Sequence, residues 1–232
     1  MLNQFGPDIW TADGPIVSAA AGFHYPTRMA VVRLANGDLV IWSPTALTGE
    51  LQTAVQALGP VRFLVPPNSL HHTFIGEWQQ AFPEARVHAP PGLSEKRRDI
   101  RFDGNLADGP PAAWAGQIDL ELMRGNRITT EAVLFHRESR TALVADLLQQ
   151  LPQGWFKGWR ALVARLDLMV AAEPSVPRNF RAAFTDRRAA RDTVQRILTW
   201  PTEKLIIAHG PLVPQGGQAL LHRAFHWLIN AR

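Results

Sequence analysis

The chain has 232 residues, of which 46% are hydrophobic and 19% are charged, and its formal net charge is +4. This length and apolar content fit one large globular domain with a core of two or three layers. The chain has no cysteine, which excludes disulfides, thiolate metal sites and cysteine nucleophiles. The basic residues are scattered and most have acidic neighbours, so we expect no nucleic-acid partner.

The N-terminal stretch MLNQFGPDIW has no basic segment followed by an apolar one, so no secretory signal is predicted. No apolar run in the sequence reaches the roughly 18–20 residues that a membrane span needs. We therefore expect a cytoplasmic protein with no membrane partner.

The first third of the chain is rich in predicted strands. The run IVSAAA at 16–21 follows a Gly-Pro turn, and two further β-rich runs flank Asn36 and Gly37, a pair typical of a tight hairpin. An amphipathic helix is predicted from a cap at Thr48 to Gly59. The continuous apolar run VRFLV at 61–65 is typical of a strand buried on both faces.

A helix at 74–82, ended by Pro83, and a short strand at 85–89 follow. The stretch from 48 to 89 therefore alternates helix and strand, which indicates parallel pairing. The remaining predicted elements are strands at 118–123, 132–136, 141–148 and 204–208 and helices at 154–172, 186–200 and 217–230.

Antiparallel hairpins and parallel units thus occur in one chain of 1–232, which we interpret as a single domain. A mixed α/β fold with two β-sheets packed face to face and helices on their outer faces, αββα, accommodates both better than a doubly wound sheet.

Three polar positions stand at or near the ends of apolar strands. His71 and His72 follow VRFLV, Asp146 follows TALVA, and His209 follows KLIIA. Loops beyond the carboxyl ends of strands are where such folds place ligand sites. Histidine and aspartate are ligands that suit zinc, iron or manganese, so the pattern favours a metal site.

In this order the stretches resemble the metallo-β-lactamase-like superfamily, and within it a bacterial family whose function is not characterised. The matching segments span residues 27–209, most of the chain: TRMAVVRLANGDLVIWSP, VPPNSLHHTFIGEWQQAFPEARVHAPPGL, EAVLFHRESRTALVADLL and LIIAHG. The resemblance implies the αββα sandwich with a metal site at one edge of the two sheets.

The resemblance also implies that the usual ligand set is reduced. The superfamily's His-x-His-x-Asp-His loop, with its last histidine laid on His72, has Pro67 and Ser69 where two histidines are expected and His71 in place of the aspartate. Asp146 matches the bridging aspartate and His209 the final histidine. The histidine of the expected Gly-His-x-x-Gly turn has no counterpart near residues 125–127.

Four residues remain as candidate ligands of a single ion: His71, His72, Asp146 and His209. The implied ion is one zinc, iron or manganese, and a metal-free site is the alternative. Asp146 is also the candidate catalytic group, as a ligand or as the residue that orients a water molecule. The function hypothesis is a metal-dependent hydrolase of unknown substrate. The alternative is a catalytically silent protein that binds a small ligand or a protein partner in the same cleft.

Several other polar residues are assigned on weaker grounds. His222 and His226 have the i, i+4 spacing of metal ligands but no accompanying glutamate, so a structural role is preferred. His24 could line the mouth of the site, and Glu131 could reach its edge. Arg28 is expected to pair with Glu131 or Asp146, because a buried arginine needs a carboxylate.

Overall fold

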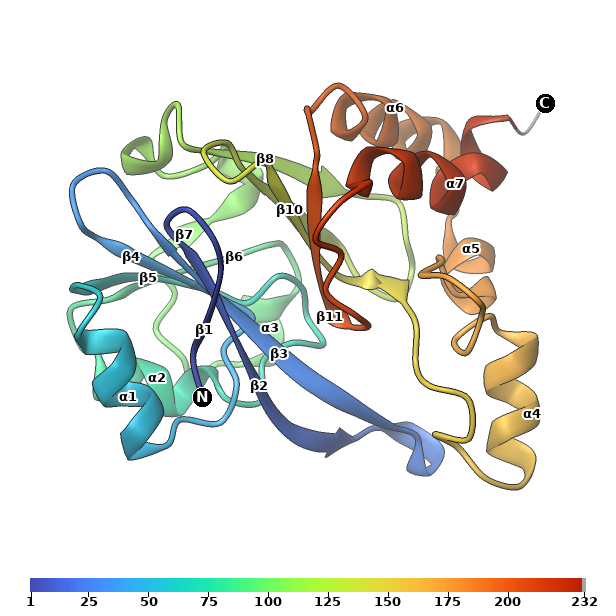
Figure 1. Cartoon of the computed structure of the whole chain (residues 1–232), viewed down its shortest axis with the longest axis horizontal. Helices are drawn as coiled ribbons and strands as arrows, with labels where there is room; N and C mark the ends of the chain where they lie inside the picture. The colour runs from blue at the N-terminus through green and yellow to red at the C-terminus, as the bar shows by residue number, and fades with distance from the viewer. Residues whose placement is uncertain (231–232) are drawn as a thin grey trace.

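A computed structural model describes residues 1–230 of the chain. Its strands form a seven-stranded sheet, in the order β1-β2-β3-β4-β5-β6-β7, and a four-stranded sheet, in the order β11-β10-β9-β8 (Figure 1). The strands of the first sheet are β1 (Asn3–Gly6), β2 (Ile9–Ser18), β3 (His24–Arg33), β4 (Leu39–Trp42), β5 (Val61–Val65), β6 (Arg86–Ala89) and β7 (Gly104–Asn105). Those of the second are β8 (Ile118–Met123), β9 (Glu131–His136), β10 (Thr141–Gln149) and β11 (Lys204–His209).

Both sheets are mixed, as the sequence predicted. In the first sheet β1 to β4 pair antiparallel and β4 to β7 pair parallel. In the second sheet β8, β9 and β10 pair antiparallel, and β11 lies parallel to β10. The hairpin around Asn36 and Gly37 is confirmed, with Gly37 at φ 89°, where glycine carries no steric cost.

Seven α-helices and three short 3-10 helices complete the described chain. They are α1 (Gly49–Gln56), α2 (Ile75–Ala81), α3 (Leu93–Lys96), α4 (Trp159–Leu166), α5 (Arg178–Ala183), α6 (Arg187–Ile197) and α7 (Gly217–Ile229), with η1 (Ala20–Gly22), η2 (Leu106–Asp108) and η3 (Ala112–Trp114). The predicted caps are present: the side chain of Thr48 accepts from Leu51 N, and that of Asp186 accepts from Ala189 N.

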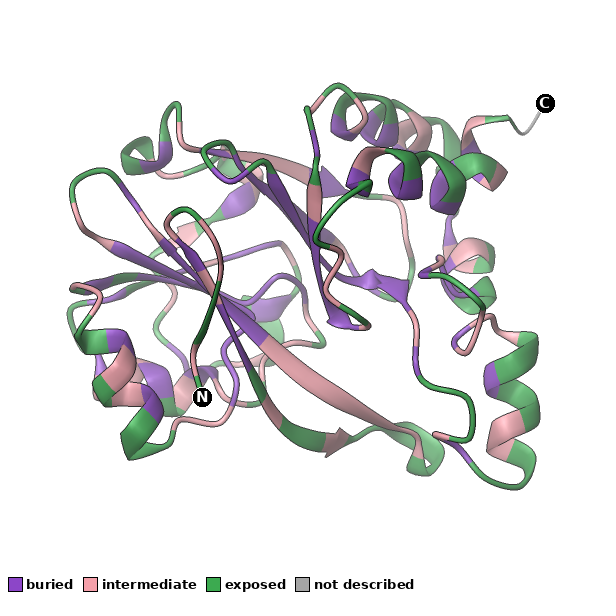
Figure 2. Ribbon diagram, in the orientation of Figure 1, coloured by how far each residue is buried: buried purple, intermediate pink, exposed green. Residues whose placement is uncertain are grey.

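Strand alternation assigns each side chain to a layer. In β10, Leu143 and Ala145 belong to the cluster between the sheets, whereas Ala142 and Val144 pack under α6 and α7. In β4 the alternate residues likewise divide between the central cluster and the cluster under α1 and α2. The layers are therefore α, β, β and α, and Figure 2 shows the buried strands between helices that are exposed on their outer sides. The predicted αββα sandwich is confirmed.

Some predicted bounds were wrong. The helix predicted at 154–172 is only α4, because Gly158 at φ 59° precedes it and Leu168 at φ 66° follows it. The strand predicted at 16–21 is instead the long β2, which pairs with β1, and the sequence reasoning missed β1, α3 and α5. Among the described helices, none combines the length and the apolar character that a bilayer span requires.

Candidate metal centre

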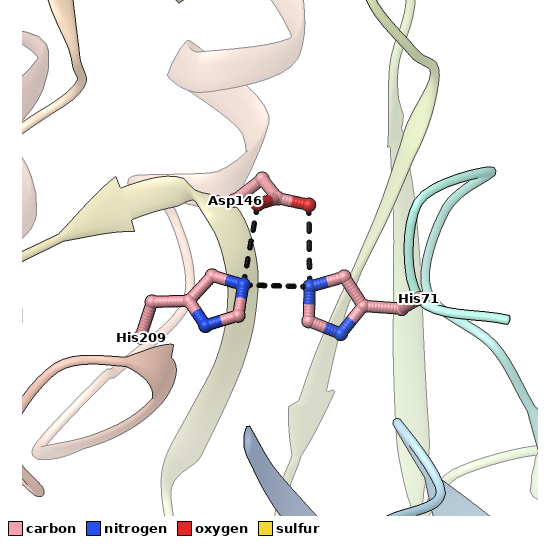
Figure 3. A group of neighbouring side chains, drawn as sticks. All are labelled: His71, Asp146 and His209. Atoms are coloured by element: carbon pink, nitrogen blue, oxygen red, sulfur yellow. Dashed lines mark hydrogen bonds and ion pairs between the residues drawn. The ribbon is translucent and has the colours of Figure 1, made fainter. Parts of the chain in front are cut away.

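Three of the four predicted ligand residues come together between the two sheets. His71 lies in the loop after β5, Asp146 lies within β10, and His209 ends β11 (Figure 3). The Nε2 atoms of the two histidines are 3.1 Å apart, His71 Nε2 is 3.2 Å from Asp146 Oδ2, and His209 Nε2 is 3.3 Å from Asp146 Oδ1. Within residues 1–230 this is the one group of three or more potential ligand residues that converges in this way.

The far nitrogen of each histidine is held by a second residue. His209 Nδ1 donates to the Pro26 carbonyl oxygen at 2.8 Å, and His71 Nδ1 is hydrogen-bonded to Ser43 Oγ at 2.9 Å. A carbonyl oxygen only accepts, so the neutral His209 ring carries its proton on Nδ1 and directs the Nε2 lone pair at the group. Metal-binding histidines are oriented in this way by outer partners.

His72 lies outside this group. Its Nδ1 is 3.1 Å from Arg97 Nη1. Arg97 Nη1 also donates to the backbone carbonyl of His72 at 2.6 Å. Burial and the charges of Lys96 and Arg97 lower the pKa of His72. Of the adjacent pair, His71 therefore occupies the ligand position. His72, the fourth candidate ligand, takes no part in the three-residue group, because its ring faces Arg97.

Asp146 occupies a break in the pairing of the second sheet. The parallel register between β10 and β11 holds from Thr141 to Val144 and shifts before Gln149. The sequence predicted Asp146 at or beyond the end of this strand, but the residue lies inside it. Its carboxylate is nevertheless free to face the histidines. Burial by itself raises its pKa, but the charges and hydrogen bonds of His71 and His209 lower the pKa well below the usual range.

A buried network supports Asp146 from behind. Asn68 is fully buried, and its side-chain amide donates to Asp146 Oδ2 at 2.8 Å and to Glu131 Oε2 at 3.1 Å. Its side-chain oxygen, Oδ1, accepts from the backbone nitrogens of Leu70 and His71. The loop that carries His71 is thus tied to the carboxylate that faces it. The sequence reasoning missed Asn68, because a loop asparagine gives no sign that it is buried.

Glu131 reaches the site from behind, as a support to the backbone of β10. Its two oxygens accept from the backbone nitrogens of Ala145, Asp146 and Leu147, at 2.8, 2.8 and 3.2 Å. Burial and the neighbouring Asp146 charge raise the pKa of Glu131 to about 8. Its role at the edge of the site is therefore to hold the irregular segment that presents Asp146.

Arg28 pairs with neither of the carboxylates expected for it. It binds Asp13 at 2.7 Å and donates to the backbone carbonyls of Ile207, at 2.8 Å, and Gly210. These carbonyls lie on either side of His209, so Arg28 fixes the end of β11. Arg28 thus positions His209 through the backbone and makes no hydrogen bond to the side chains of the three-residue group.

The group opens into a cavity of about 520 Å³. Tyr25 lines it, with its ring 5.1 Å from that of His209, and its hydroxyl has no hydrogen-bond partner within the described chain. Burial, with the charges of Asp146 and Asp167, raises the pKa of Tyr25 to about 12. Tyr25 therefore presents a neutral hydroxyl at the site. His24 faces away and packs on Trp155 and Phe156.

The remaining histidines lie elsewhere. His222 and His226 are exposed on α7 and take no part in a ligand group within the described residues. His136 is buried at the β9–β10 turn, where its Nδ1 is 2.8 Å from Ser139 Oγ.

His136 predicts a loss of stability in acid. Burial lowers its pKa to about 4, only partly opposed by the charge of Asp8. In the unfolded chain His136 therefore binds a proton near pH 6.5, whereas in the folded chain it binds one only near pH 4. The free energy of unfolding should fall by about 2 kcal/mol from pH 7 to pH 5 on this account. Urea titrations of wild type and His136→Gln at both values measure it, and equal pH slopes in the two proteins would refute it.

Comparison with known proteins places the chain in a family. Residues 8–158, more than half of the chain, match the family described as "Domain of unknown function (DUF4336)". The chain belongs to the DUF4336 family. The matched residues of this DUF4336 protein include His71 and Asp146 but end before His209. No curated protein matches the sequence.

Solved structures establish the fold of the DUF4336 protein. A metallo-β-lactamase from Pontibacter korlensis has a TM-score of 0.65 at 16% identity, with 100% of this chain and 99% of that one covered. The metallo-β-lactamase FIM-1 from Pseudomonas aeruginosa, in a mono-zinc form, has a TM-score of 0.61 at 12% identity, with 100% and 96% covered. A Flv1 flavodiiron core from Synechocystis has a TM-score of 0.66 at 10% identity, with 98% and 60% covered. The chain therefore has the metallo-β-lactamase fold.

Proposed function

We propose that the protein is a metal-dependent hydrolase that uses one ion, held by His71, Asp146 and His209. The observation that carries the proposal is the spacing of the three donor groups, 3.1 to 3.3 Å. Atoms bound tetrahedrally to one zinc at 2.0–2.1 Å lie about 3.3 Å from one another. Three protein ligands also leave a fourth position open, as in catalytic zinc sites.

A second ion has little protein to hold it. Ser69, which stands where a histidine ligand is expected, is bound through Oγ to Thr129 Oγ1 at 2.9 Å. The carbonyl of Pro67, at the other missing position, accepts from Ala132 N at 2.7 Å. Both residues therefore connect the loop after β5 to β9 and the segment before it, and neither offers a metal ligand. FIM-1 in its mono-zinc form has the same fold with one zinc, so a single-ion site is compatible with this architecture.

The ligand set accepts more than one metal. Two imidazoles and one carboxylate suit zinc, and the same set is typical of non-haem iron. Manganese is the third candidate. Metal analysis of the purified protein therefore has to cover all three.

In the proposed hydrolysis the ion, Asp146 and Tyr25 would each have a separate role. A bound ion would supply Lewis-acid chemistry and lower the pKa of a water molecule to roughly 7. Asp146 would orient that water, with Asn68 holding the carboxylate in place. Tyr25 would donate its hydroxyl proton in a hydrogen bond to the substrate oxygen on which charge develops.

A panel of lactones, thioesters, phosphodiesters and β-lactams, each with added zinc, manganese or iron, tests this function. A cavity of about 520 Å³ fits small molecules of this size. Turnover that depends on metal and is lost in Asp146→Ala supports the hydrolase. Absence of metal-dependent turnover on every class, with the metal bound, counts against it.

Tyr25→Phe should lower kcat by about a hundredfold, because it removes one donor to the developing negative charge. Metal content should not change, since the phenol lies against the His209 ring and bonds to none of the three ligands. Steady-state kinetics and metal analysis of the same preparation measure both. Wild-type kcat in Tyr25→Phe would remove this role from Tyr25.

A catalytically silent ligand-binding protein is the second candidate, and one observation favours it. If Ser43 donates to His71 Nδ1, then His71 Nε2 carries a proton and can donate to Asp146 Oδ2 at 3.2 Å. The three groups would then satisfy one another without an ion. Protein that binds no zinc, iron or manganese and turns over nothing in the panel, yet binds a small molecule in the cavity, would establish this reading.

A further inference from the structure

The helix α4 carries its large apolar side chains on the side that faces solvent. Their exposed fractions are 55% for Trp159, 60% for Leu162, 40% for Val163 and 57% for Leu166. At about 100° of rotation per residue these four positions fall on one arc, which we call the α4 stripe. The opposite side of the helix carries small side chains. Ala164 is fully buried and Ala161 is partly buried, and both pack in a cluster with Phe156 and Met169.

Basic residues border the α4 stripe. Lys157, Arg160 and Arg165 are the charged residues between positions 157 and 166, and the segment has no acid. Within residues 1–230 none of the three forms an ion pair; Arg160 lies over the Trp159 ring at 4.7 Å and donates to the Ala21 carbonyl. On the helix, Arg160 and Arg165 lie on either side of the apolar arc. The net charge of the whole chain, +4, has the same sign.

The charge pattern decides what fits this surface. Two copies of the chain, placed stripe to stripe, would bring unpaired cations against cations. Even at the roughly 250 Å² of a large aromatic side chain, four side chains at the observed fractions present at most roughly 500 Å², less than the roughly 800 Å² per partner that a stable dimer buries. A surface with negative charges and an apolar interior matches both the cations beside the stripe and its apolar side chains.

We propose that the α4 stripe binds the surface of an anionic lipid bilayer. Trp159, Leu162 and Leu166 enter the boundary between headgroups and acyl chains, while Arg160 and Arg165 reach the lipid phosphates. This peripheral contact differs from a membrane span, and it replaces the expectation of no membrane partner. It does not depend on the metal site.

The stripe lies close to the mouth of the metal centre. Arg160 binds η1, at the tip of the β2–β3 hairpin, and Phe23 in the same hairpin packs on Trp159 at 5.8 Å. Tyr25, two residues further on, lines the cavity. Figure 1 shows α4 beside this hairpin at one end of the molecule, and Figure 2 shows its outer side as exposed. Lipid contact would therefore bring the cavity mouth near the bilayer.

Flotation with vesicles tests the proposal. Wild type should float with vesicles of equimolar phosphatidylcholine and phosphatidylglycerol, and much less with pure phosphatidylcholine. The double variant Leu162→Glu with Leu166→Glu should lower the bound fraction by about tenfold or more, because it places two charges in the apolar arc. Both side chains are exposed, so circular dichroism should show an unchanged fold.

A charge-matched pair separates a local site from general attraction. Lys157→Gln with Arg165→Gln should weaken binding to the anionic vesicles several-fold. Arg187→Gln with Arg188→Gln removes the same charge from exposed positions on α6, far from α4 (Figure 1), and should leave binding near that of wild type. Equal losses in the two pairs, or no flotation of wild type, overturn the proposal. So does a wild-type dimer in sedimentation that the Leu162 and Leu166 substitutions dissociate.

Discussion

His71→Ala should lower bound metal from about one equivalent per chain to less than about a tenth, because it leaves two protein ligands where three are needed. The side chain of His71 is one of three that meet at 3.1 to 3.3 Å. Metal analysis of protein purified without chelator measures the change directly. His209→Ala should have the same effect.

The adjacent histidine gives a matched control. His72→Ala makes the same chemical change one residue along the chain, but His72 faces Arg97 instead of Asp146. It should keep about the metal content of wild type. Loss of metal in His72→Ala with retention in His71→Ala would reverse our assignment. Equal content in all three proteins would show that the ion binds elsewhere.

Glu131→Ala should destabilise the fold by about 3–5 kcal/mol, because several buried donors lose their acceptor at a cost of about 1–3 kcal/mol each. Glu131 is 1% exposed and accepts from three consecutive backbone nitrogens of β10 as well as from Asn68. Without the carboxylate these donors are buried and unpaired. Urea denaturation at pH 7 measures the loss.

Glu138 provides the comparison, because it is an exposed glutamate in the next turn. Glu138→Ala should stay within about 0.5 kcal/mol of wild type. Glu131→Gln keeps one acceptor oxygen and should fall between the two, which also serves if Glu131→Ala does not fold. A Glu131→Ala protein within about 1 kcal/mol of wild type would show that the backbone of β10 does not need this support.

The layers of the fold could be predicted because they follow from local patterns. The apolar runs of β4, β5 and β11 and the caps at Thr48 and Asp186 are all visible in the sequence. The N-terminal strands were predicted only in part, because Gly14 and Pro15 indicate a turn but lie inside β2, where the register shifts, and the edge strand β1 has few apolar residues. The length of α4 depends on backbone angles at Gly158 and Leu168, which the sequence does not reveal.

The candidate site could be predicted in part. His209 follows from its place at a strand end and from the resemblance, and Asp146, which lies within β10, follows from the resemblance. The choice between His71 and His72 depends on the loop conformation, which Asn68 sets through two backbone hydrogen bonds. Glu131, Ser43 and Pro26 meet the site only through tertiary contacts between distant parts of the chain. Their roles become visible when both sheets are in place.

Anomalous diffraction from crystals of protein grown in the presence of zinc tests the central claim most directly. We predict a single anomalous peak between His71 Nε2, His209 Nε2 and the Asp146 carboxylate, absent in crystals of His71→Ala. Two peaks at the site would contradict the single-ion proposal, and no peak between these three residues would contradict the metal centre itself.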